Sequence, residues 1–114
     1  MSEFTYLFRG GRPAGAPPEQ WQQQMQKWVA WIKQLGEKGY IKDQGRPLER
    51  TGKVVTGKEK TIVDGPYAEA KDIVGGYMLI EAKDLTNALK ISKNYPILDI
   101  KNSIKVRPVM KVDI

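Results

Sequence analysis

IVDGPYAEAKDIVGGYMLIEA, residues 62–82, is the segment of this 114-residue chain that says most about its architecture. It places Asp64-Gly65-Pro66 directly after a β-branched run, which predicts the end of one strand. After a short Ala/Glu-rich segment it continues as an apolar strand with adjacent glycines, Gly75 and Gly76. Glycines leave no side chain on the faces of a strand, so either another part of the chain approaches the backbone closely there or a bulge forms.

The strand predicted at residues 73–82 is apolar on both faces. Alternation places two sets of side chains on opposite sides: Ile73, Tyr77 and Leu79 on one, and Val74, Met78 and Ile80 on the other. A strand of this kind has to be covered on both sides.

The N-terminal part predicts a strand and a helix. Residues 3–9 alternate, with Phe4, Tyr6 and Phe8 on one face and Thr5, Leu7 and Arg9 on the other. A Gly/Pro-rich loop follows, and a helix then begins near Pro18 and ends at Gly36 or Gly39. Its expected buried stripe consists of residues at helical spacing: Trp21, Met25, Trp28, Ile32 and Leu35.

The remaining elements are a hairpin, a helix and a strand. Residues 46–63 predict the hairpin, with its turn at Thr56-Gly57. Asp84 is expected to N-cap the second helix, whose apolar side is Leu85, Ala88, Leu89 and Ser92. Residues 104–114 alternate as a half-buried strand, and Pro108 places that strand at an edge or a bulge.

This order predicts an α+β fold, a ferredoxin-like βαββαβ-type subunit with a hairpin insertion, as one domain over residues 1–114. Two helices cover one face of an antiparallel sheet, and the other face is too apolar to stay bare. We therefore expect a homodimer packed sheet to sheet, with any pocket between a sheet and its partner or its loops.

The composition narrows the chemistry. The chain has no Cys and no His, which excludes disulfides, thiolate chemistry and a histidine base, so we predict no bound transition metal and no cofactor. There is no apolar run near 18 residues and no signal-like N-terminus, so we expect a cytoplasmic protein with no membrane contact. The net charge is +6, and residues 37–63 carry seven cations and four anions. Their signs alternate without interleaved aromatic residues, so we expect no direct nucleic-acid binding.

The segment from residue 63 to 98, followed by SIKVRPV, resembles the DGPF-type branch of the YCII-related family. Asp64-Gly65-Pro66-Tyr67-Ala68-Glu69 is similar to its signature, with Tyr in place of Phe, and GGY at 75–77 and VRPV at 106–109 follow at the family's spacing. The Trp-rich first helix is less typical. The resemblance implies a ferredoxin-like subunit that forms a dimeric α+β barrel.

Asp64 is the central candidate for the site. Its carboxylate can simply cap the turn through the backbone N–H groups that follow it. Alternatively it faces the barrel pocket, where the same donors would lower its pKa. The broader family is associated with a His–Asp pair facing one cavity, but this chain has no His, so that pair is impossible here.

Five further residues are candidates for proton transfer or ligand binding: Tyr6, Arg9, Tyr67, Lys71 and Tyr77. Each has a structural alternative. Tyr6 and Tyr77 can fill the core and hydrogen-bond to the backbone, Arg9 can pair with Asp64 or Glu69, and Lys71 can be solvated.

Three functions stay open. The first is binding of a small organic, possibly anionic, molecule in the dimer cavity. The second is a lyase- or isomerase-like enzyme with Asp64 as general base. The third, implied only by the resemblance, is a regulatory partner linked to an extracytoplasmic-function sigma factor.

Overall fold

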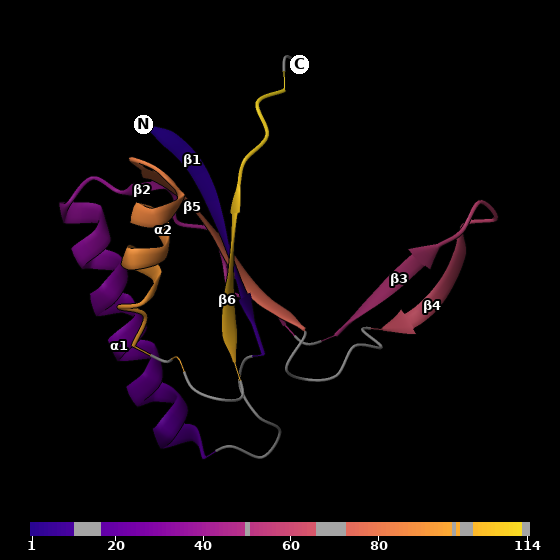
Figure 1. Cartoon of the computed structure of the whole chain (residues 1–114). Helices are drawn as coiled ribbons and strands as arrows, with labels where there is room; N and C mark the ends of the chain where they lie inside the picture. Colours follow the sequence, from indigo (N-terminus) through magenta and orange to yellow (C-terminus); the bar gives the residue numbers. More distant parts are fainter. Residues whose placement is uncertain (11–16, 50, 66–72, 97, 99–101, 113–114) are drawn as a thin grey trace.

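The computed structural model describes residues 1–10, 17–49, 51–65, 73–96, 98 and 102–112 (Figure 1). The elements follow one another in the order β1 (Ser2–Arg9), α1 (Pro18–Glu37), β2 (Ile41–Asp43), β3 (Gly52–Thr56), β4 (Thr61–Gly65), β5 (Val74–Ala82), α2 (Leu85–Ser92) and β6 (Ser103–Pro108). The mixed α+β class expected from the sequence is confirmed.

Four strands form one antiparallel sheet in the order β2-β5-β1-β6. Together with the two helices, this arrangement is compatible with a ferredoxin-like fold. The strand β2, at one edge of this sheet, is three residues long, and sequence analysis did not predict it. The predicted hairpin strands, β3 and β4, pair with each other in a separate two-stranded sheet.

Both helices lie against the same face of the four-stranded sheet, which we call the covered face (Figure 1). Phe4, Tyr6 and Phe8 of β1 point into this layer, as predicted, and Met78 and Ile80 of β5 are fully buried beside them. The hydrophobic core therefore sits between the covered face and the two helices.

Helix α1 buries the predicted side and, in addition, Trp31. Trp31, Ile32 and Leu35 are buried, whereas Trp28 is only partly buried. The predicted stripe omitted Trp31, whose ring stacks on Tyr6 at 6.4 Å between centroids and meets Phe8 edge-on at 6.3 Å. Helical spacing did not predict that Trp31 is more deeply buried than Trp28. Which of the two rings is covered depends on where the aromatic side chains of β1 lie across from the helix.

Asp84 N-caps helix α2, as predicted: its side chain accepts a hydrogen bond from the Asn87 backbone N–H at 2.8 Å. The predicted apolar side is partly wrong. Leu85 and Leu89 are 42% and 43% exposed, and Ile91 takes the buried position beside Ala88 and Ser92. The buried side of α2 therefore consists of Ala88, Ile91 and Ser92, and its two leucines face outward.

The two adjacent glycines of β5 satisfy both alternatives raised by the sequence. Phe8 pairs with Gly76 and Arg9 with Val74, so Gly75 is the extra residue of a bulge. The carbonyl of Gly75 accepts a hydrogen bond from the Leu48 N–H at 2.8 Å. A Cβ on Gly76 would lie 3.2 Å from the carbonyl oxygen of Arg46. Residues 45–48, the crossing segment, therefore run directly beside the glycines at this edge of β5, where Pro47 forms an antiparallel bridge with Gly76.

Strand β6 lies at an edge of the four-stranded sheet, as Pro108 predicted. Ile104 and Val106 are half-buried on the covered side. The expected continuation of the strand to residue 114 is wrong for the described residues, because β6 ends at Pro108 and the side chains of Met110 and Val112 are 81% and 58% exposed. One backbone hydrogen bond beyond it, from Val109 N–H to Glu3 carbonyl at 3.0 Å, ties the chain to β1.

We call the β3–β4 hairpin the arm. It projects from the sheet on the side opposite to the helices (Figure 1). Its strands pair from Gly52–Gly65 to Thr56–Thr61, and its turn is closed by a hydrogen bond from Lys60 N–H to Gly57 carbonyl at 3.2 Å. Every described residue of β3 is exposed. The arm is therefore ordered by its own ladder rather than by packing against the core.

Candidate functional site

The face of the four-stranded sheet that carries no helix, here the open face, has an apolar centre. Leu7 pairs with Tyr77 across β1 and β5, and Thr5 pairs with Leu79. Leu7 and Leu79 are half-buried by their neighbours, whereas Tyr77 is 38% exposed. This uncovered apolar surface contains the second apolar face that the pattern of residues 73–82 predicted.

Cations line one side of that apolar centre. Lys105 pairs with Leu7, and Arg107 pairs with Thr5, so both side chains alternate onto the open face. Arg9 follows on the same face of β1, opposite Ser103. Lys105 and Arg107 are exposed, and neither forms an ion pair within the part of the chain that the structure describes. The open face thus combines an aromatic ring, two leucines and a basic edge.

Sequence analysis named Arg9 and Tyr77 but missed Lys105 and Arg107. The signal was present, because the last strand alternates and its polar members had to lie opposite Ile104 and Val106. The sequence pattern does not show that β6 pairs with β1 rather than with another strand. That pairing brings the cations beside Leu7.

Tyr77 is held in place by the crossing segment. A Cβ on Gly45, which has φ +68°, would lie 1.8 Å from the Tyr77 carbonyl oxygen, so only glycine fits there. The Asp43 carboxylate accepts a hydrogen bond from the Gly45 N–H at 2.9 Å and orients the turn. The backbone of Tyr77 is therefore fixed between β1 and the crossing segment, with its ring towards the open face.

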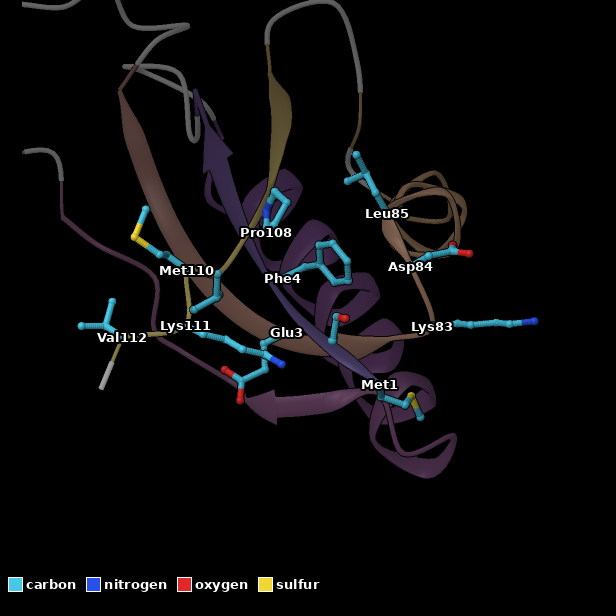
Figure 2. Close-up of a pocket in the computed structure, with 12 residues that line it drawn as sticks. Met1, Glu3, Phe4, Lys83, Asp84, Leu85, Pro108, Met110, Lys111 and Val112 are labelled. Atoms are coloured by element: carbon cyan, nitrogen blue, oxygen red, sulfur yellow. The ribbon is translucent and has the colours of Figure 1, made fainter. Parts of the chain in front are cut away.

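A groove of ≈ 880 Å³ lies at the end of the sheet where the chain begins (Figure 2). Its apolar lining includes Met1, Phe4, Leu85 and Met110. Figure 2 shows Lys83 directed away from the groove and Lys111 directed towards Glu3. Of the proposed site residues that the structure describes, Tyr6, Arg9 and Tyr77 do not line this groove.

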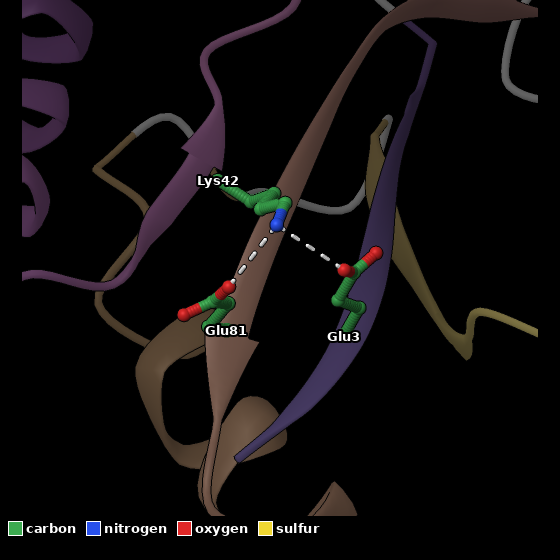
Figure 3. A network of polar contacts seen from close by, with 3 residues as sticks. All are labelled: Glu3, Lys42 and Glu81. Atoms are coloured by element: carbon green, nitrogen blue, oxygen red, sulfur yellow. Dashed lines mark ion pairs between the residues drawn. The ribbon is translucent and has the colours of Figure 1, made fainter. Parts of the chain in front are cut away.

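The same end of the open face carries a three-residue charge cluster (Figure 3). Glu3 and Glu81 are directly opposite each other on β1 and β5, and Lys42 of β2 lies between them. Its Nζ is 3.5 Å from an oxygen of each carboxylate. Glu3 first and then Glu81 raise the pKa of the Lys42 ammonium. We call this cluster the acidic triad, because two carboxylates share one ammonium.

Tyr6 lies on the covered face, so the sheet separates it from Arg9 and Tyr77. Its hydroxyl donates a hydrogen bond to the Ala88 carbonyl of α2 at 2.6 Å. Burial raises the pKa of Tyr6 well above its usual value, so the hydroxyl stays protonated and acts as a donor. This geometry is that of a core tyrosine that links the sheet to a helix.

The three remaining candidates, Asp64, Tyr67 and Lys71, lie in residues 64–71. Asp64 is in β4, opposite Lys53, at the root of the arm. Tyr67 and Lys71 lie outside the described residues. Of the proposed site residues, the structure brings Arg9 and Tyr77 to one face.

Among the described residues, no group of three or more Asp, Glu, His or Cys is arranged to hold a metal ion. The expectation of no metal and no cofactor stays a prediction. No helix in the described part of the chain is both long and apolar enough to cross a membrane.

The family model of the YCII-related domain matches residues 7–113. The chain therefore belongs to the YCII-related family. No curated protein matched the chain.

Proposed function

We propose that this YCII-related chain binds a small organic anion on the open face of its sheet. The observation that carries the proposal is the basic edge: Lys105 and Arg107 stand beside Leu7 and Tyr77 in register, and Arg9 follows on the same face. An aromatic ring and aliphatic side chains favour an apolar body, and cations favour a carboxylate, sulfonate or phosphate on it.

The proposal includes a second copy of the chain. The open face is apolar at its centre and has no helix over it, so a homodimer packed sheet to sheet would form a dimeric α+β barrel with the ligand cavity inside. The resemblance of Asp64-Gly65-Pro66 and GGY to the DGPF-type branch supports the same arrangement. In this proposal the chain is one cytoplasmic domain, and the arm is an insertion in the ferredoxin-like plan.

Two other functions stay predictions from the sequence. The lyase- or isomerase-like enzyme requires Asp64 as general base, and the regulatory role requires a sigma factor as partner. Substitution of Asp64 by Asn separates the enzyme from the binding protein, because Asn keeps the capping ability of Asp but cannot accept a proton.

The test uses an aromatic sulfonate, anilinonaphthalene sulfonate, as the probe, since it combines an apolar body with an anion. We expect saturable binding that is about tenfold weaker in Lys105→Gln/Arg107→Gln, equivalent to about 1.4 kcal/mol. Added salt should weaken binding to the wild type more than to this variant. The matched control, Lys33→Gln/Lys90→Gln, removes two exposed helix cations and should bind the probe as the wild type does.

Equal binding by the wild type and by Lys105→Gln/Arg107→Gln would refute the basic edge as the anion site. Sedimentation equilibrium tests the second copy separately. A folded wild type that stays monomeric at micromolar concentration would refute the barrel.

A further inference from the structure

The arm has apolar side chains that nothing in the described chain covers. Val55 and Ile62 pair across β3 and β4 on one face of the arm, and they are 64% and 65% exposed. Among the described elements, the arm makes extensive contacts only between its own two strands. A lone two-stranded hairpin is at best marginally stable in water. The arm therefore needs a surface to pack on.

The position of the arm indicates where that surface is. The arm projects on the side of the open face, away from both helices (Figure 1). Any molecule that approaches the open face therefore meets the arm as well. Since the open face and the arm belong to the same chain, a second copy related by a two-fold axis would give each arm an open face to contact, so the contact would be made twice.

Charge complementarity favours a second copy of the chain as the molecule that the arm contacts. The acidic triad holds two carboxylates and one ammonium, which leaves one negative charge at that end of the open face. The turn of the arm carries Lys58, Glu59 and Lys60, which leaves one positive charge. Lys60 is fixed in a left-handed conformation, φ 57°, so the turn has a defined shape. The turn therefore presents a net positive charge on a defined backbone, opposite in sign to the net negative charge of the acidic triad.

We propose that the arm packs on the open face of a second copy and supplies Lys58 or Lys60 to that copy's acidic triad. Because each copy does the same, the two copies exchange arms. The proposal rests on the sheet-to-sheet pairing in the proposed function and adds a contribution from the partner, without which each open face is incomplete. The Val55–Ile62 pair then packs towards the apolar centre around Leu79, and the arm closes one end of the cavity.

Cross-linking tests the contact directly, because the chain has no natural cysteine. Val55→Cys, on the face of the arm proposed to pack, and Leu79→Cys, on the open face, are made as separate proteins, mixed, and treated with a short bis-maleimide. We expect a cross-linked heterodimer of the two variants. The control replaces the open-face cysteine by Gln34→Cys, exposed on α1, which should give no product with the arm.

A charge exchange tests the partners of the turn. Lys58→Glu/Lys60→Glu and Glu81→Lys should each dimerise about tenfold more weakly than the wild type, equivalent to about 1.4 kcal/mol. Mixed together, they should form a heterodimer of near wild-type affinity, since each arm then meets an open face of opposite charge. The control Lys27→Glu/Lys33→Glu makes the same charge change on the exposed side of α1 and should leave the affinity unchanged.

The outcomes separate the two proposals. A Leu79→Cys protein that cross-links to itself, with no arm product and with charge variants that dimerise as the wild type does, overturns the arm exchange and keeps the paired sheets. A monomeric wild type overturns both. Cross-linking through the arm together with rescue in the mixed charge variants supports both.

Discussion

The two faces of strand β1 are built from alternate residues of one segment, yet they differ in every physical respect. Phe4, Tyr6 and Phe8 lie under two helices, and the one hydroxyl among them is hydrogen-bonded. Leu7 and Arg9 lie on the open face beside further charges. The covered face is complete within the chain, whereas the open face is an apolar centre with a basic edge and an acidic end. The difference indicates that the stability of the monomer resides on the covered face, and the binding proposed above would use the open face.

The largest loss of stability is expected for one of two neighbouring residues of β5 that lie on opposite faces of the sheet. Ile80→Ala empties a fully buried position on the covered face and should lower the free energy of unfolding by about 2–5 kcal/mol. Leu79→Ala, on the open face, should cost on the order of 1 kcal/mol in the monomer because Leu79 is only half-buried. Urea denaturation of both variants at low protein concentration measures the contrast. Equal losses would contradict the division of the sheet into two faces.

The next effect concerns the crossing segment. Gly45→Ala places a Cβ against the Tyr77 carbonyl and should destabilise the protein by about 1–3 kcal/mol more than Gly39→Ala. Gly39 is the matched control, because its φ of +78° is equally left-handed but nothing lies within 4 Å of its Cβ position. Thermal melting of the two variants makes the comparison. If Gly45→Ala also weakens binding of the anionic probe, Tyr77 is positioned by this contact.

A smaller effect is expected at the cap of α2, which holds part of the layer over the covered face. Asp84→Ala removes the acceptor for the Asn87 N–H and should cost about 1 kcal/mol. Asp84→Asn should be close to neutral, since Asn caps equally well. Chemical denaturation measures both, and probe binding should stay unchanged in both, because the cap serves the covered face. A loss of probe binding in Asp84→Asn would contradict that separation.

The smallest effect is expected on the open face itself. Lys42→Gln leaves Glu3 and Glu81 directly opposite each other and should lower the melting temperature slightly at low salt. Adding Glu81→Gln should restore the melting temperature, and added salt should shrink the difference. A Lys42→Gln protein that melts like the wild type in low salt would show that the acidic triad contributes nothing to the folded monomer.

Much of the fold could be predicted from the sequence because its long elements have clear periods. The alternation of residues 3–9 assigned both faces of β1 correctly, and the apolar run at 73–82 marked the central strand β5. The three-residue β2 could not be predicted, because so short a segment has no period. Trp31 and Ile91 were missed because their burial is decided by what lies across from each helix.

The site could be predicted only in part. Arg9 and Tyr77 were named for their positions in the strands, but what brings Lys105 and Arg107 beside them is strand pairing, which is a long-range property. Tyr6 was named as a candidate and also as a core residue, and its hydrogen bond to Ala88 corresponds to the second description. The role of Asp64 could not be predicted, because it depends on the geometry of a turn and on neighbouring residues that a single sequence does not define.

The bulge at Gly75 has a consequence for the slow opening motions of the molecule. Its carbonyl holds the Leu48 amide at 2.8 Å, although Leu48 lies outside every strand. In native-state hydrogen exchange, that amide should open together with β5, and the crossing segment should therefore belong to the cooperative unit of the sheet. Amides of the arm, only a few residues further on, should exchange independently and faster. The boundary between the two exchange regimes would then fall between Leu48 and Gly52, so the arm could reorganise without the sheet unfolding.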